Sequence, residues 1–176
     1  MTDRGDAELA LLLHRHVTDL FMWLSDYPEE QVDRSAVASI ERDIGRATGQ
    51  RPDGRRAPRL TKGSGDETLK RAIGLLVDVN WWLDTCSDED VDEWVAGNLQ
   101  EGTAYLLAEL PDEQRSRLLE VIEVLAVTEQ HEGRRYEIRF FPFAMGLVET
   151  EPTETKPLHR RWVRPQDRTP GPAAEE

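Results

Sequence analysis

The sequence predicts an all-α protein: a single-domain bundle of about five helices with a disordered C-terminal tail. Apolar residues recur at spacings of three and four as far as residue 130, which is the periodicity of amphipathic helices. A chain of 176 residues fits one domain with its own core. After residue 150 the chain has five prolines and little apolar content, which is typical of disorder. We therefore expect a helical domain over 1–150 and a Pro-rich, mixed-charge tail over 151–176.

The first helix is predicted over residues 6–24, because one face of that stretch is apolar. The residues on this face are Leu9, Leu13, Val17, Leu20 and Leu24. A second helix should begin near Ser35, a good N-cap, and end before Gly49. Residues 49–65 contain two prolines and four glycines, so we expect a loop.

The third helix is predicted over residues 66–85 and should be the most buried one. Apolar residues occupy nearly every face of it from Ile73 to Leu83, which indicates a central helix. Asp78 and Asn80 interrupt this run and need polar partners if they are buried. Together with His16, they would indicate a ligand pocket if the fold brought them together.

The stretch TCSDEDVDEW, residues 85–94, resembles either a calcium loop or the start of a helix. Counted from Asp88 as an EF-hand loop, it has carboxylates at positions 1, 3 and 5. It then has Glu93 where glycine is required and Leu99 where the last ligand should stand. We therefore expect no metal here, and interpret Ser87 as the N-cap of a helix whose first turn is acidic.

Two further elements follow the break after Leu110. A helix should begin at Asp112 and end at Gly133. Residues 136–147 alternate apolar and charged side chains as a strand would, but a single strand has nothing to pair with. We favour a short helix that ends before Pro142, followed by an apolar segment laid across the bundle, with the strand left as the alternative. No internal repeat is visible.

The charge distribution predicts a partner of opposite charge. The formal net charge is −13, and residues 84–101 hold seven acids and no Lys or Arg. Such a surface attracts cationic partners and repels nucleic acid, although solubility alone also explains it. We predict a non-catalytic module that binds a basic partner protein. The predicted partner-binding residues are Asp88, Asp90, Asp92 and Glu93 for steering, with Trp82 and Trp94 as anchors.

A nucleic-acid-associated regulator is the alternative, because the basic charge gathers in the predicted loop and in the tail. The residues that would contact phosphate are Arg55, Arg56, Arg59, Lys62, Arg160, Arg161 and Arg164. The acidic body opposes approach to phosphate. A basic segment tethered to such a body can instead fold back onto it.

No motif in the chain identifies a reaction, a metal or a cofactor. The four histidines are scattered, and His14 and His16 point to different faces of their helix. Carboxylates around Cys86 raise the pKa of its thiol and disfavour a nucleophile. An enzyme or small-molecule binder with a pocket built from scattered residues is the remaining alternative.

The sequence also bears on location and assembly. No apolar run approaches the roughly 20 residues of a membrane span, and the N-terminus does not resemble a signal peptide. A single cysteine suits a reducing compartment, so we expect a cytoplasmic protein. Adjacent tryptophans and the apolar segment FFPF leave surface that a homodimer would use.

Residues 74–149 resemble a type of uncharacterised small, acidic, all-helical bacterial protein of the kind found in actinobacteria. The resemblance lies in WWLDTCSDEDVDEWVAGNLQEGTAYLLAELPDEQRSRLLEVIEVLA followed by FFPFAMGLVE. Some small acidic helical proteins of this kind are immunity or antitoxin proteins, which neutralise a toxin by binding it. The resemblance implies a helical fold and a protein-binding role, and it carries no catalytic residue.

Overall fold

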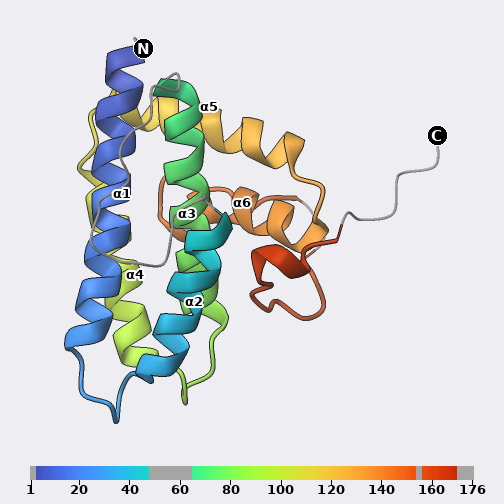
Figure 1. Ribbon diagram of the computed structural model, residues 1–176. Helices are drawn as coiled ribbons and strands as arrows, with labels where there is room; N and C mark the ends of the chain where they lie inside the picture. The colour runs from blue at the N-terminus through green and yellow to red at the C-terminus, as the bar shows by residue number, and fades with distance from the viewer. Residues whose placement is uncertain (1–2, 48–64, 154–155, 170–176) are drawn as a thin grey trace.

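The computed structural model describes residues 3–47, 65–153 and 156–169, and its described part is built from six helices (Figure 1). These are α1 (Asp3–Asp26), α2 (Arg34–Ala47), α3 (Gly65–Thr85), α4 (Glu93–Ala108), α5 (Asp112–Thr128) and α6 (Glu132–Ala144), followed by a 3-10 turn, η1 (Pro165–Asp167). The described residues contain no β-strand, so the all-α class is confirmed. The bundle has six helices, whereas the sequence predicted about five.

The helix pair α1 and α3 forms the centre of the bundle, and the two helices lie side by side (Figure 1). The apolar stripe predicted for α1 is fully buried at Leu9, Leu13, Leu20 and Leu24. Helix α3 is buried from Ile73 to Leu83 on all sides, because α1, α4, α5 and α6 all pack against it. The sequence prediction of a central third helix is therefore confirmed.

Helices α1–α2 and α3–α4 form two equivalent helix–loop–helix units. In the first loop the N–H of Val32 donates to the carbonyl of Pro28 at 3.1 Å. In the second, the N–H of Val91 donates to the carbonyl of Ser87, also at 3.1 Å. The loops pair with each other through an isolated antiparallel bridge between Val32 and Val91.

The hydrogen bonds across this bridge are reciprocal. The N–H of Asp33 donates to the carbonyl of Asp90, and the N–H of Asp92 donates to the carbonyl of Gln31, both at 2.8 Å. The two units are structural repeats shifted by the 59 residues between Val32 and Val91. The repeat is not visible in the sequence, because little beyond Trp-Leu before each loop and Val-Asp at its end recurs.

The bridge also sets where the second helix of each unit begins. Asp92 is the N-cap of α4, since its side chain accepts the N–H groups of Trp94 and Val95. The predicted N-cap, Ser87, instead lies five residues earlier, at the start of the loop. The expectation of a helix starting at Ser87 was therefore wrong, because residues 88–92 form a turn and the bridge before the helix begins.

The helix favoured over a strand around residues 136–147 is confirmed by α6, but its predicted end before Pro142 was wrong. It begins at Glu132 and continues through Pro142 to Ala144. Proline is tolerated there because it stands in the last turn, where only one helical hydrogen bond is lost. Gly146 follows the end of the helix; its φ of +68° favours glycine, and its N–H donates to the carbonyl of Phe143 at 3.0 Å.

The C-terminal strap, residues 156–169, lies against the bundle beside α6 (Figure 1). Its η1 turn contacts α2, and Trp162 packs partly buried against the core. Residues 156–169 of the tail expected to be disordered have defined side-chain partners on the helices, whereas residues 154–155 and 170–176 lie outside the described part. The division of the chain at residue 150 stays a prediction.

Candidate functional site

The paired loops gather acidic residues at one end of the bundle. This acidic end, residues 26–34 and 88–93, contains one basic residue, Arg34, whose guanidinium lies 3.8 Å from the carboxylate of Glu29. Its acids are Asp26, Glu29, Glu30, Asp33, Asp88, Glu89, Asp90, Asp92 and Glu93. Nine carboxylates against one guanidinium give this end a strongly negative potential.

Most of the predicted partner-binding residues lie at this end. Asp88, Glu93 and Trp94 are exposed, with Trp94 at 64%. Asp90 is half-buried in the turn, and Asp92 is committed to capping α4. Trp82 does not lie on the surface, because it points from α3 into the core and is only 6% exposed. The prediction of Trp82 as a surface anchor therefore has no support in the fold.

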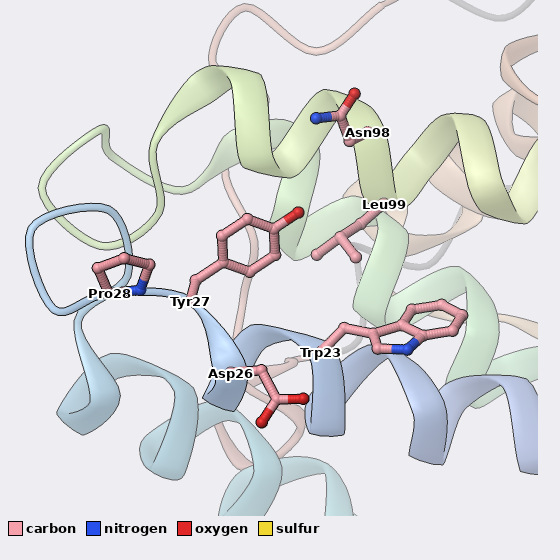
Figure 2. Close-up of a pocket in the computed structure, with 6 residues that line it drawn as sticks. All are labelled: Trp23, Asp26, Tyr27, Pro28, Asn98 and Leu99. Carbon is pink, nitrogen blue, oxygen red and sulfur yellow. The ribbon is translucent and has the colours of Figure 1, made fainter.

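An open pocket of about 350 Å³ adjoins the acidic end. Helix α1 and the loop after it provide one wall, and α4 provides the other (Figure 2). The lining residues are Trp23, Asp26, Tyr27, Pro28, Asn98 and Leu99. The Tyr27 ring stands in the middle of this group and points toward α4 (Figure 2). The pocket therefore offers two aromatic rings and a single carboxylate, that of Asp26.

Sequence reasoning missed this pocket because its walls are some seventy residues apart in the chain. In the sequence, Trp23 stands beside the apolar stripe of the first helix, next to Leu24. The available signal was its position at the edge of that stripe, where the side chain stays 39% exposed. An aromatic residue at such an edge borders both the core and the surface.

Behind the pocket, His16 makes a buried polar contact with α4. Its Nε2 lies 2.9 Å from the hydroxyl of Thr103, which itself donates to the carbonyl of Leu99 at 3.1 Å. Because a hydroxyl has only one hydrogen, Nε2–H of His16 is the donor. The ring meets Trp23 edge-on, with centroids 6.0 Å apart. Burial lowers the pKa of His16, and the carboxylate of Asp19 opposes that shift.

A second polar cluster lies where the C-terminal strap meets α3 and α6. Arg160 donates from Nε and Nη2 to the two oxygens of Glu137, at 2.8 and 2.7 Å. Its Nη2 also lies 2.6 Å from Asp84, and its guanidinium is 4.6 Å from the ring centroid of Phe140. Glu137 is only 4% exposed, so this is a largely desolvated ion pair.

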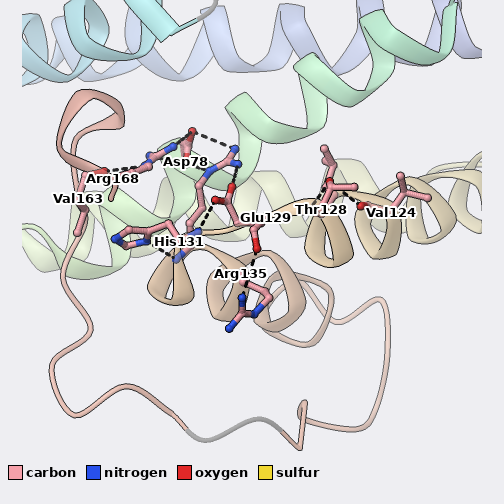
Figure 3. Close-up of polar contacts among 10 residues, drawn as sticks. Asp78, Val124, Thr128, Glu129, His131, Arg135, Val163 and Arg168 are labelled. Atoms are coloured by element: carbon pink, nitrogen blue, oxygen red, sulfur yellow. Dashed lines mark hydrogen bonds and ion pairs between the residues drawn. The ribbon is translucent and has the colours of Figure 1, made fainter. Parts of the chain in front are cut away.

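Arg168 of the strap makes an equivalent contact further along α3. Its Nη2 and Nη1 donate to the two oxygens of Asp78 at 2.9 and 3.3 Å (Figure 3). Asp78 is buried and also accepts Nε of Arg134 at 3.0 Å. Arg134 in turn binds Glu129, and Trp81 lies beneath the guanidinium of Arg168.

Asp78, Asn80 and His16 do not form the common cluster that the sequence analysis considered. His16 pairs with Thr103 of α4, whereas Asp78 pairs with arginines of α6 and the strap. The side-chain amide nitrogen of Asn80 donates to the carbonyl of Leu76 at 2.8 Å. Each residue thus has its own partners.

The residues of the nucleic-acid alternative are divided between the strap and residues outside the described part. Arg55, Arg56, Arg59 and Lys62 lie outside the described residues. In the strap, the guanidinium of Arg160 is bound by carboxylates and that of Arg164 lies 2.6 Å from Asp167. Arg161 is exposed.

Comparison with protein-family models, with curated proteins and with solved structures finds no match. The family resemblance of residues 74–149 therefore stays a prediction. Within the residues that the structure describes, no group of three or more His, Cys, Asp or Glu side chains is placed to hold a metal ion. In the same part of the chain, none of the helices combines the length and the apolar character that crossing a membrane requires.

Proposed function

We propose that the protein is a non-catalytic protein-binding module whose acidic end docks a basic segment of a partner protein. The observation that carries the proposal is the position of the pocket of about 350 Å³ beside nine carboxylates. An apolar side chain of the partner enters the pocket, and Lys or Arg residues flanking it meet the carboxylates. Desolvated aromatic contacts supply affinity, and the charges supply rate and specificity.

The residues divide between these two roles. Asp88, Glu89 and Glu93 are exposed and steer the partner. Trp23 and Tyr27 form the pocket, with Trp94 as an exposed aromatic at the start of α4. The sharpest form of the proposal is an immunity-type protein, acting in the cytoplasm, which neutralises a toxin by covering a basic surface.

The two structural repeats give independent support for docking at this place. In the second unit, the hydroxyl of Thr85 accepts the backbone N–H of Trp162 at 3.0 Å, so the strap docks at the end of that unit's first helix. The equivalent residue in the first unit is Asp26, which lines the open pocket. The same helix end is thus covered in one unit and open in the other.

The charge component is tested with the partner obtained by affinity capture at low salt and then purified. The variant Asp88→Asn, Glu89→Gln, Glu93→Gln removes three exposed carboxylates from the acidic end. The matched control, Glu109→Gln, Glu113→Gln, Glu149→Gln, removes three exposed carboxylates elsewhere. Calorimetry at low and high salt should show affinity about tenfold weaker and less salt-dependent for the first variant only. Equal losses in both variants would mean that net charge alone acts, which contradicts the proposal.

The pocket component is tested with Trp23→Ala against Met22→Ala, its exposed neighbour that does not line the pocket. We expect Trp23→Ala to weaken the complex by about thirtyfold or more at both salt concentrations, as hot-spot aromatics do. Met22→Ala should leave affinity within about twofold. Unchanged affinity of a folded Trp23→Ala protein would remove the pocket from the proposal.

A further inference from the structure

Two guanidinium groups of the C-terminal strap insert into the bundle, in addition to the contacts of Trp162 with Thr85 and of Gln166 with Asp43. Each enters a receptacle made of a carboxylate and an aromatic ring: Glu137 with Phe140 for Arg160, and Asp78 with Trp81 for Arg168. Both carboxylates are bound through two hydrogen bonds. This bidentate geometry suits the planar fork of arginine, and lysine cannot reproduce it.

The face of α3 and α6 beneath the strap is strongly acidic by itself. Four carboxylates lie on or beside these two helices, those of Asp78, Asp84, Glu129 and Glu137. Arg134 of α6 pairs with Asp78 and Glu129, whereas Asp84 and Glu137 pair with Arg160 of the strap. Asp78 and Glu137 are only 5% and 4% exposed with the strap in place. Buried carboxylates need cationic partners, and here these are guanidinium groups, those of Arg134, Arg160 and Arg168.

Beside the strap, this face contains a small cavity and two buried polar atoms that lack a hydrogen-bond partner. A cavity of about 30 Å³ lies beside Arg160 and is lined by Asn80, Trp81, Gln100 and Phe140, among others. The Oδ1 of Asn80 and the Nε1 of Trp81 are buried and have no hydrogen-bond partner in the structure. Both residues line this cavity and are at least nine-tenths buried.

We propose that this α3–α6 face is a binding site for an arginine-bearing segment of a partner protein, and that the chain's own strap occupies it until such a segment displaces it. The chemistry of the occupant is given by the strap: two guanidinium groups eight residues apart, with an aromatic side chain between them, at Trp162. The inference goes beyond the acidic-end proposal and does not rest on it, because the receptacle carboxylates lie outside the acidic end.

The strap, because it belongs to the same chain, determines how tightly a partner's segment must bind in order to displace it. A short intramolecular segment acts at an effective concentration in the millimolar range, so a weaker external segment does not enter. Weakening the strap without truncating the chain should therefore open the site.

The test uses full-length protein and a labelled synthetic peptide that copies residues 156–169, KPLHRRWVRPQDRT. The open variant Arg160→Ala, Arg168→Ala removes the two inserted guanidinium groups. The matched control, Arg161→Ala, Arg164→Ala, removes two exposed guanidinium groups of the same strap. At about 0.3 M salt, where surface charges are screened, we expect the open variant to bind the peptide at least tenfold more tightly than wild type or control.

A peptide with alanine at the positions of Arg160 and Arg168, which keeps its other basic residues, should not bind the open variant. Equal binding of both peptides, or equal affinity of all three proteins, would show a general charge effect and overturn the proposal.

If the open variant does not fold, the double variant Arg160→Lys, Arg168→Lys takes its place. It keeps the positive charges but loses the bidentate hydrogen bonds of the guanidinium groups. This second variant should also gain peptide affinity, and a folded protein without that gain overturns the proposal. Peptide binding that survives Asp88→Asn, Glu89→Gln, Glu93→Gln separates this site from the acidic end.

Discussion

Individual residues of this protein owe their chemistry to burial more than to their neighbours in sequence. The carboxylates around Cys86 predicted a raised thiol pKa, and the structure confirms the direction. Burial is the largest cause, and Asp90, Asp88 and Asp84 add to it. Burial disfavours the charged form of an imidazole as well. It therefore lowers the pKa of His16, whereas it raises the pKa of the Cys86 thiol.

The Cys86 thiol should react slowly with alkylating agents and disulfides. Burial and the nearby carboxylates raise its pKa to about 11, so only about one thiol in a thousand is ionised at pH 8. We expect the reaction with Ellman's reagent at that pH to be at least tenfold slower in the folded protein than in the urea-unfolded chain. Equal rates in the two states would show that the thiol is not shielded.

Stability should fall as the pH is lowered through the range where His16 titrates. The pKa of His16 in the folded protein lies below its ordinary value of 6.5. The unfolded chain therefore binds the proton first, so the stabilisation is complete above pH 6.5 and is lost as the pH falls through the folded pKa. Urea unfolding between about pH 7.5 and pH 5.5 should show this loss. His16→Gln, which keeps a donor for Thr103, should reduce it; an unchanged slope assigns the effect to other groups.

At the scale of the elements, contacts between distant loops determine where helices begin. Asp33 and Asp92 hold corresponding positions in the two repeats, and each accepts the N–H two residues later, at 2.7 and 2.9 Å. The side-chain hydroxyl of Ser87 accepts the N–H of Asp90, at a longer 3.3 Å. The bridge between Val32 and Val91 places both caps, because it fixes the residue immediately before each of them.

The cap of α4 is tested by comparing Asp92→Ala with Ser87→Ala. Removing a side-chain N-cap lowers the free energy of unfolding by about 1 kcal/mol, so Asp92→Ala should do so. Asp33→Ala should have a similar effect, since Asp33 is its structural equivalent. Ser87→Ala should change stability by less than about 0.5 kcal/mol. A larger effect at Ser87 than at Asp92 in urea unfolding would restore the helix start predicted from sequence.

Two glycines inside helices, Gly74 and Gly102, differ in the space around them for an added side chain. A Cβ at Gly102 of α4 would meet nothing within 4 Å, whereas one at Gly74 of α3 would lie 3.1 Å from Nη2 of Arg134. Alanine at either position favours the helix by about 1 kcal/mol. We expect Gly102→Ala to raise the melting temperature and Gly74→Ala to fall clearly below it, because Arg134 is held by Asp78 and Glu129. Equal gains would mean that Arg134 is free to move.

At the scale of the whole molecule, paired and unpaired charges lie in different places: ion pairs inside the fold, and an excess of carboxylates at the acidic end. Basic side chains from α5, α6 and the strap pair with carboxylates inside the fold, at Arg117, Arg134, Arg160 and Arg168. The acidic end keeps nine carboxylates with one basic residue. The fold thus retains its unbalanced negative charge largely at the surface proposed to meet a partner.

This distribution predicts that moderate salt stabilises the protein. Raising the ionic strength from about 0.02 to 0.2 M shortens the Debye length to roughly 7 Å, which screens repulsion among the exposed carboxylates. The buried arginine pairs are screened much less. The melting temperature should therefore rise, and by a smaller amount in Asp88→Asn, Glu89→Gln, Glu93→Gln. A fall in melting temperature with salt would show that exposed ion pairs outweigh the repulsion.

The sequence by itself determined the all-α class, the buried stripe of α1 and the central position of α3. These follow from apolar periodicity, which is a local property of the chain. It also located the second loop's share of the acidic end, five of the nine acids, since they cluster within residues 88–93. It did not reveal the matching acids of the first loop, because only the pairing of Val32 with Val91 brings the two loops together.

Only the tertiary structure decided how the charged residues are used. Arg160 and Arg168 look like part of a solvated basic tail in sequence, and their partners Glu137 and Asp78 are 23 and 90 residues away. Trp82 looked available for a partner, but α3 turns it into the core. The physical reason is the same in each case: periodicity fixes which face a helix buries, whereas ion pairs and pockets depend on which elements the fold places opposite one another.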